Sequence, residues 1–169
     1  METRSVELIV RGLNEATVRY LIAGGVAVVA HGYVRFTADL DLILDLEAEN
    51  LRRAVAIFGS LGYRPRAPVP LEQFVERDNR TRWVREKGLT VFSLFSPEHQ
   101  ATEVDLFVEC PLDFDKAYAA AVRMELAPGL VASFVGYEDL VFLKGQAGRP
   151  QDVEDIERLK ALRQGAGDE

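Results

Sequence analysis

The chain has 169 residues, the usual length of one domain, and its 48% hydrophobic and 28% charged residues are typical of a folded globular protein rather than a disordered one. A single cysteine, Cys110, excludes an internal disulfide framework and any thiolate metal cluster within one chain. A net charge of −7 argues against non-specific binding to nucleic acid, which depends on the neutralisation of phosphates.

Helices and strands are predicted to alternate along the first half of the chain. The first helix carries Val6, Ile9 and Leu13 at helical spacing, and a short apolar strand follows it and stops at Gly24-Gly25. The predicted elements of this half are a helix over 5–18, a strand over 20–23, a helix over 26–31, a strand over 39–44 and a helix over 47–61.

The second half is predicted to begin with strands and to end with helices. The proline-rich region 63–80 has no clear pattern. Beyond it we expect strands over 82–86, 89–95 and 102–108, a helix over 115–121, short strands over 122–126 and 131–135, and helices over 137–145 and 152–162. This order predicts a single α+β (α/β-like) domain over residues 1–169, in which a mixed β-sheet is flanked by helices and the C-terminal helices (about 137–163) pack on it.

The stretch from residue 21 to residue 44 carries the most informative motif. A strand runs into Gly24-Gly25, where glycines permit a close backbone approach and the start of a helix offers N–H groups to a phosphate. Further on, Asp39 and Asp41 project from the same face of a strand, about 6.6–6.8 Å apart along it. Two carboxylates so placed repel each other, and a divalent cation relieves the repulsion. Oxygen ligands beside a phosphate suit Mg²⁺.

Asp105 is a third acid of interest because it lies in the middle of a predicted strand between apolar neighbours. An aspartate is costly in such a position unless it has a partner. If that strand lies beside the one that carries Asp39 and Asp41, three carboxylates converge. Three carboxylates could hold two metal ions about 3.5–4 Å apart, which is the arrangement for in-line displacement at phosphorus.

These motifs resemble the signature of the DNA polymerase β-like nucleotidyltransferase superfamily, in which Gly24-Gly25 is followed after thirteen residues by Asp39-x-Asp41 and later by Val104-Asp105. The residues over 23–41 are similar to those of small bacterial nucleotidyltransferases, including the abortive-infection toxins of toxin–antitoxin systems, and aminoglycoside-modifying nucleotidyltransferases are close too. The later run from Lys144 to Asp155 resembles the Lys…Arg…Asp-x-x-Asp motif of those toxins. The chain departs from the full-length toxins because it has no room for most of their additional C-terminal helical region. Its Gly-Gly also differs from the Gly-Ser of minimal relatives that serve as antitoxins.

The resemblance implies a role for each motif. Asp39 and Asp41 bind Mg²⁺, as one or two ions, and Asp105 is either the third metal ligand or the base for the attacking hydroxyl. The remaining motif positions are implied to bind the phosphates of an NTP such as ATP: Gly24, Gly25, Arg35, Thr37, Lys144 and Arg149. The implied reaction is attack of an acceptor hydroxyl on the α-phosphorus, with transfer of the nucleotide and release of pyrophosphate.

Several of these residues have a plainer structural interpretation that stays open. His31 is interpreted as structural rather than as part of a metal site, and Thr37 as orienting its loop. Arg35 either neutralises phosphate or forms an ion pair with Asp39 or Asp45. Lys144 and Arg149 are alternatively cations near a helix C-terminus, and Asp152 is alternatively a favourable acid in the first turn of the last helix.

A basic cluster between Arg77 and Lys87 also allows two interpretations. It could bind an acceptor such as RNA, with Trp83 available for stacking. The interpretation we favour is the solvent face of an edge strand over 82–86, where charge prevents aggregation.

Three functions are therefore compared. The first is an active Mg²⁺-dependent nucleotidyltransferase, such as a toxin–antitoxin component that acts on tRNA or protein. The second is an antibiotic nucleotidyltransferase with a small-molecule acceptor, and the third is a non-catalytic, antitoxin-like module that binds a cognate partner. No signal peptide precedes the first helix and no apolar run approaches the roughly 20 residues of a membrane span, so we expect a cytoplasmic protein with no membrane partner.

Overall fold

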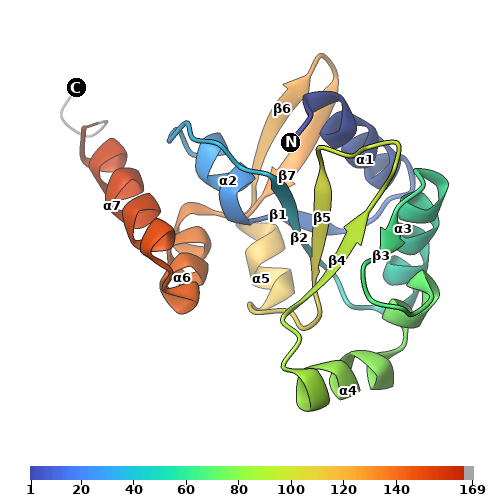
Figure 1. Ribbon diagram of the computed structural model, residues 1–169. Helices are drawn as coiled ribbons and strands as arrows, with labels where there is room; N and C mark the ends of the chain where they lie inside the picture. The colour runs from blue at the N-terminus through green and yellow to red at the C-terminus, as the bar shows by residue number, and fades with distance from the viewer. Residues whose placement is uncertain (166–169) are drawn as a thin grey trace.

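The computed structural model describes residues 1–165, which form seven α-helices, seven strands and one 3₁₀-helix (Figure 1). In chain order these elements are α1 (Thr3–Glu15), β1 (Tyr20–Ile22), α2 (Gly24–Ala30), β2 (Asp39–Leu44), α3 (Ala48–Ser60), β3 (Arg64–Pro65), the 3₁₀-helix η1 (Leu71–Val75), α4 (Arg77–Lys87), β4 (Val91–Phe95), β5 (Glu103–Phe107), α5 (Phe114–Ala119), β6 (Val122–Ala127), β7 (Leu130–Phe134), α6 (Tyr137–Ala147) and α7 (Pro150–Gly165). Among the described residues, no helix has the length and apolar composition needed to cross a membrane.

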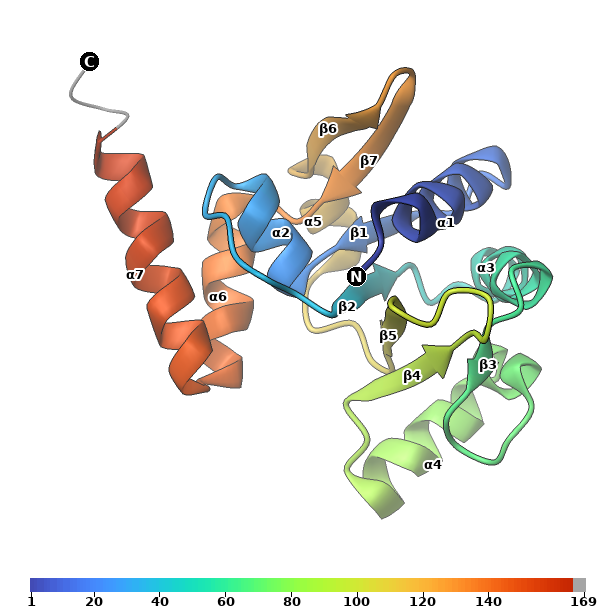
Figure 2. The same cartoon turned by 45° about the horizontal axis from the view of Figure 1, so that its top comes forward.

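All seven strands join one mixed sheet in the order β3-β4-β5-β2-β1-β7-β6. The pairs β2–β5 and β1–β7 are parallel and the other pairs are antiparallel. Helices flank the sheet (Figures 1 and 2). The helices α1 and α3 lie together on one side of it. On another side, α6 lies between α7 and the rest of the molecule. This architecture confirms the predicted α+β class.

The apolar core lies between the sheet and the helices α1 and α3. Each helix buries one stripe of side chains at helical spacing, such as Ile9 and Leu13 in α1 and Leu51 and Phe58 in α3. In β2, successive side chains alternate between the two faces of the sheet, and Leu40 and Leu42 are fully buried. The same alternation turns the aspartates of β2 to the opposite face.

The predicted strand over 82–86 is wrong, because these residues lie in α4. Arg80 and Trp83 are both buried at an i,i+3 spacing, and Trp83 stacks on Phe92 with ring centroids 5.0 Å apart. The five residues Arg-Trp-Val-Arg-Glu over 82–86 are too few to distinguish a strand from a helix with one buried face. Because Trp83 is only 5% exposed, it is not available to stack on RNA. The interpretation of the basic cluster as the solvent face of an edge strand is also wrong, because these residues form a helix.

The other predicted elements are present with shifted ends. The helix predicted over 26–31 begins two residues earlier at Gly24, and the last helix begins at Pro150, a residue that suits the first helical position because its missing N–H needs no partner there. The proline-rich region 63–80 forms β3, η1 and the first turn of α4.

Candidate active site

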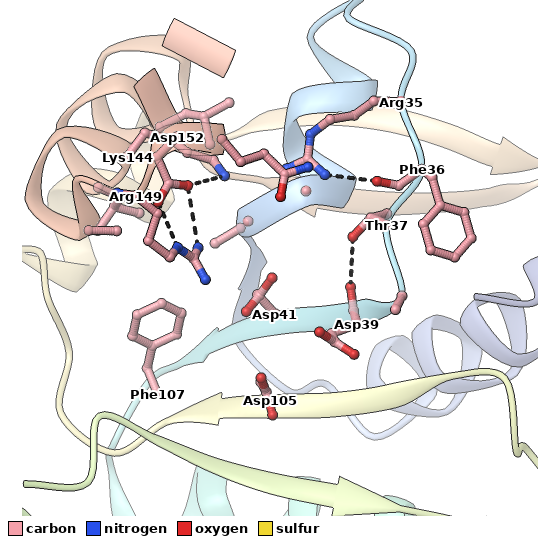
Figure 3. Close-up of a pocket in the computed structure, with 18 residues that line it drawn as sticks. Arg35, Phe36, Thr37, Asp39, Asp41, Asp105, Phe107, Lys144, Arg149 and Asp152 are labelled. Carbon is pink, nitrogen blue, oxygen red and sulfur yellow. Dashed lines mark hydrogen bonds and ion pairs between the residues drawn. The ribbon is translucent and has the colours of Figure 1, made fainter. Parts of the chain in front are cut away.

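The pairing of β2 with β5 brings the three predicted carboxylates to one place. The two strands are parallel, with Asp41 opposite Asp105 and Asp39 opposite Glu103. Figure 3 shows the carboxylates of Asp39, Asp41 and Asp105 facing one another. All three line a single pocket of about 350 Å³.

These carboxylates carry negative charge that the protein itself does not neutralise. Burial, followed by repulsion from Asp105 and Asp39, raises the pKa of Asp41 to about 6 against the opposing effect of Lys144 and Arg149. Burial and repulsion from Asp105 and Glu103 also raise the pKa of Asp39. Within residues 1–165, none of the three carboxylates forms an ion pair, whereas the neighbouring Glu103 accepts a hydrogen bond from Arg66 Nε at 2.8 Å.

The donor set fits Mg²⁺ that is shared with a substrate, and does not fit a complete protein cage. In the described part of the chain, no group of three or more His, Cys, Asp or Glu side chains is arranged to hold a metal ion. Mg²⁺ does not require such a group, because it usually keeps several waters and binds through one or two carboxylates together with substrate phosphates. Two ions held by three carboxylates therefore remain a prediction.

Gly24 and Gly25 form the edge of the pocket beside the carboxylates. Gly24 has φ +59°, and a Cβ atom there would lie 1.8 Å from Oδ2 of Asp41. A Cβ atom on Gly25 would lie 2.4 Å from Oγ1 of Thr37. The two glycines are thus required by the close packing of Asp41 and Thr37, whether or not a phosphate is bound.

Arg35 and Thr37 lie on the extended segment between α2 and β2, and both line the pocket. Arg35 donates from Nε and Nη2 to the two carboxylate oxygens of Asp155, at 2.7 and 2.8 Å. Asp39 and Asp45, which we had considered as ion-pair partners of Arg35, are therefore the wrong partners. Thr37 Oγ1 donates to the backbone carbonyl of Asp39 at 3.4 Å, a contact that orients the loop.

The wall opposite β2 and β5 is formed by α6 and α7, and its charges are paired. Lys144 is only 4% exposed, and its Nζ lies 2.8 Å from a carboxylate oxygen of both Asp152 and Asp155. Arg149 Nε donates to Asp152 at 2.7 Å, although the Arg149 side chain is 73% exposed. Burial would raise the pKa of Asp152, but hydrogen bonds from Arg149 and Lys144 outweigh burial and lower the pKa to about 2.

The interpretation of Lys144, Arg149 and Asp152 as charges that only stabilise helix ends is therefore incomplete. Asp152 does lie in the first turn of α7, but its carboxylate is buried against Lys144 instead of facing solvent. His31 lies outside the pocket, where its Nε2 is 2.9 Å from the carbonyl oxygen of Val135.

Sequence reasoning missed several residues of the pocket. Asp155 belongs to the Lys…Arg…Asp-x-x-Asp motif and does not line the pocket itself, but it anchors Arg35 and Lys144, and these partners could not be identified from spacing. The missed lining residues are apolar or neutral, among them Phe36, Phe107, Leu140, Leu143 and Gln151. Phe36 could have been found from the alternation of polar and apolar residues over 33–37.

Two solved structures share the fold over almost the whole chain. The crystal structure of ANT(2")-Ia in complex with adenylyl-2"-tobramycin matches with a TM-score of 0.61 and 15% identity, over 98% of this chain and 91% of that chain. An antigenic nucleotidyltransferase-like protein from Paracoccidioides brasiliensis matches with a TM-score of 0.59 and 16% identity, over 95% of this chain and 75% of that chain. The chain has the nucleotidyltransferase fold.

No protein-family model matches the sequence, and no curated protein is significantly similar to it. The structural likeness agrees with the resemblance to the polymerase β-like superfamily at the level of the fold. It does not support the narrower resemblance to abortive-infection toxins.

Proposed function

We propose that this protein is a Mg²⁺-dependent nucleotidyltransferase, which transfers NMP from an NTP to an acceptor hydroxyl and releases pyrophosphate. The observation that carries the proposal is the group of three unpaired carboxylates, Asp39, Asp41 and Asp105, on two parallel strands in one pocket. An unpaired acidic group beside an exposed arginine suits a substrate that brings both a cation and phosphates.

The proposed roles follow from where the side chains lie. Asp39 and Asp41 would hold Mg²⁺ together with the nucleotide phosphates, and bound Mg²⁺ would supply charge neutralisation at the phosphoryl oxygens. Asp105, on the other strand, is either a further ligand or the group that accepts the proton of the acceptor hydroxyl. The acceptor oxygen then bonds to the α-phosphorus, and the bond from that phosphorus to the β-phosphate oxygen breaks.

The phosphate-binding roles are divided between an exposed and a buried group. Arg149 is exposed on the pocket wall and would contact phosphate directly. The Lys144 ammonium is enclosed by Asp152 and Asp155, so we assign to it the positioning of this wall, together with Arg35. Gly24, Gly25 and Thr37 form the opposite edge, along which the triphosphate would lie.

The acceptor separates two candidate functions. Toxin-type transfer to tRNA or protein, with a cognate toxin or antitoxin as partner, rests on the motif resemblance. A small-molecule acceptor of the aminoglycoside type is favoured by the match to ANT(2")-Ia, since this chain covers 91% of that protein and needs no further domain to resemble it. An acidic pocket would also attract a cationic acceptor. The need for NTP is consistent with a cytoplasmic location in either case.

A labelling experiment tests the proposal. The protein is incubated with each of the four α-labelled NTPs, Mg²⁺ and, in separate reactions, tRNA, cell lysate or tobramycin. We expect label to reach one acceptor class with the wild type and with Asp78→Asn, an exposed control on α4, but not with Asp41→Asn. Transfer by Asp41→Asn at the wild-type rate, or no transfer to any acceptor by the wild type, would contradict the proposal.

A further inference from the structure

An exposed aromatic ring stands at the edge of the carboxylate pocket. Along residues 33–37 the side chains alternate, so that Tyr33, Arg35 and Thr37 are partly buried while Val34 and Phe36 are 81% and 80% exposed. A phenyl ring left in water forgoes the free energy of burial, and because Phe36, unlike Val34, lines the carboxylate pocket, a ligand bound there could bury it.

The backbone on both sides of Phe36 is fixed. Arg35 is held by Asp155 and also donates from Nη1 to the carbonyl of Phe36 at 2.8 Å. On the other side, the Thr37 hydroxyl donates to the carbonyl of Asp39 at 3.4 Å. The ring is therefore presented from a defined position, and Figure 3 shows it on the opposite side of the carboxylates from Phe107 and Arg149.

Phe36 also lines two hollows of different composition. One is the pocket of about 350 Å³ that holds the three carboxylates and the arginines. The other is a hollow of about 230 Å³, which Phe36 shares with the apolar side chains of Met1, Val26 and Val29 and with Arg35 and Thr37, which line both hollows. A nucleotide has the same two parts, because its triphosphate is polyanionic and its base is planar with apolar faces.

We propose that Phe36 is the surface on which the base of the bound NTP packs, while the triphosphate occupies the carboxylate pocket. This inference rests on the proposed function and adds the base-binding part of that site. Stacking tolerates any base, because every base has a π-face. Arg35 and Thr37, the two polar side chains that line the second hollow, already donate to Asp155 and to the backbone carbonyls of Phe36 and Asp39, so they provide little selection for one base and the site accepts several NTPs with similar affinity.

The test measures binding by calorimetry with the full chain, Mg²⁺ and no acceptor, and compares ATP with inorganic tripolyphosphate, which has no base. We expect the wild type to bind ATP more tightly than tripolyphosphate. Phe36→Ala weakens ATP binding by about tenfold and leaves tripolyphosphate binding unchanged, as expected when one stacking contact is lost. Phe36→Trp retains ATP binding.

Val34→Ala is the matched control, because Val34 is as exposed as Phe36 on the same segment but does not line the carboxylate pocket. This variant keeps the wild-type affinity for both ligands. Equal ATP affinities in Phe36→Ala, Val34→Ala and the wild type would overturn the inference and leave the proposed function unaffected. A Phe36→Ala variant that binds ATP as tightly as the wild type and has only a raised KM for the acceptor would also overturn the inference. If the wild type bound neither ATP nor tripolyphosphate, the proposed function itself would fail, and this inference with it.

Discussion

The two walls of the pocket treat their charges in opposite ways. On the wall formed by β2 and β5 (the strand wall), Asp39 and Asp41 have raised pKa values and no ion-pair partner within residues 1–165. On the wall formed by α6 and α7 (the helix wall), Lys144, Asp152 and Asp155 are as buried as core residues, and each forms an ion pair. The paired charges on α6 and α7 belong to the buried framework of the fold, whereas the unpaired carboxylates have raised pKa values and are the ones that we propose bind a ligand.

Removal of one unpaired carboxylate should have the largest effect, and it should fall on activity. Asp41→Asn is expected to lower the rate of nucleotide transfer by about 10³-fold or more, because metal-assisted charge stabilisation supplies several kcal/mol and each 1.36 kcal/mol is tenfold in rate. The variant should remain folded by circular dichroism. A residual rate within tenfold of the wild type would show that Asp41 is not part of the reaction centre.

Removal of the paired cation should act on stability instead. Lys144→Met leaves Asp152 and Asp155 buried around an apolar group, and we expect a loss of about 3–5 kcal/mol in the free energy of unfolding. Urea denaturation measures this loss, with Lys160→Met as the control because Lys160 is exposed on α7. Similar losses of unfolding free energy in the two variants would mean that the buried ion pairs of Lys144 do not stabilise the fold.

A substitution at the contact between Gly24 and Asp41 should affect both stability and activity. Gly24→Ala places a methyl group 1.8 Å from Asp41 Oδ2 in a residue with φ +59°, and should cost about 1–3 kcal/mol in unfolding free energy while displacing the carboxylate. Gly59→Ala in α3 meets no atom within 4 Å and should stabilise the protein by about 0.5–1 kcal/mol. The comparison fails if thermal denaturation ranks the two variants in the reverse order.

A modest gain in stability is expected from the loss of an unpaired charge. The pKa of Asp41 is raised to about 6, so its charged form destabilises the fold fully above pH 6, and this penalty disappears as the pH falls from 6 to about 4. Asp41→Asn should therefore be more stable than the wild type by about 1–2 kcal/mol at pH 8 and equally stable at pH 4.

Denaturation at the two pH values, with and without Mg²⁺, measures this difference. Mg²⁺ should stabilise the wild type and not the variant at pH 8. A variant that is less stable than the wild type at pH 8 in the absence of Mg²⁺ would argue that Asp41 has a partner in the folded protein.

The sequence was most informative where the chemistry is local. The spacing of Asp39 and Asp41 on one strand follows from the period of a β-strand, and the two glycines that begin α2 mark a close approach that any residue with a Cβ would obstruct. Asp105 was identifiable because an acid in the middle of an apolar strand needs an explanation. These three features identify the residues that line the pocket from β2 and β5, whereas the pairing of the two strands, which brings Asp41 opposite Asp105, was only a condition of that prediction.

The helix wall could not be derived in the same way, because its contacts join distant parts of the chain. Arg35 and Asp155 are separated by 120 residues, and no local pattern distinguishes Asp155 from a solvent-exposed acid on α7. The same reason explains the error at α4, where the burial of Trp83 against Phe92, which is distant from the local pattern over 82–86, decides the structure.

The parallel pairing of β2 with β5 also has a consequence for how the protein acquires its function. Residues 41 and 105 face each other only after the long intervening segment has closed, and the helix wall adds contacts between residue 35 and residue 155. Contacts between residues so distant in sequence form slowly and late in folding. A refolding chain should therefore recover its helices before the carboxylates of β2 and β5 and the wall formed by α6 and α7 come together as one pocket.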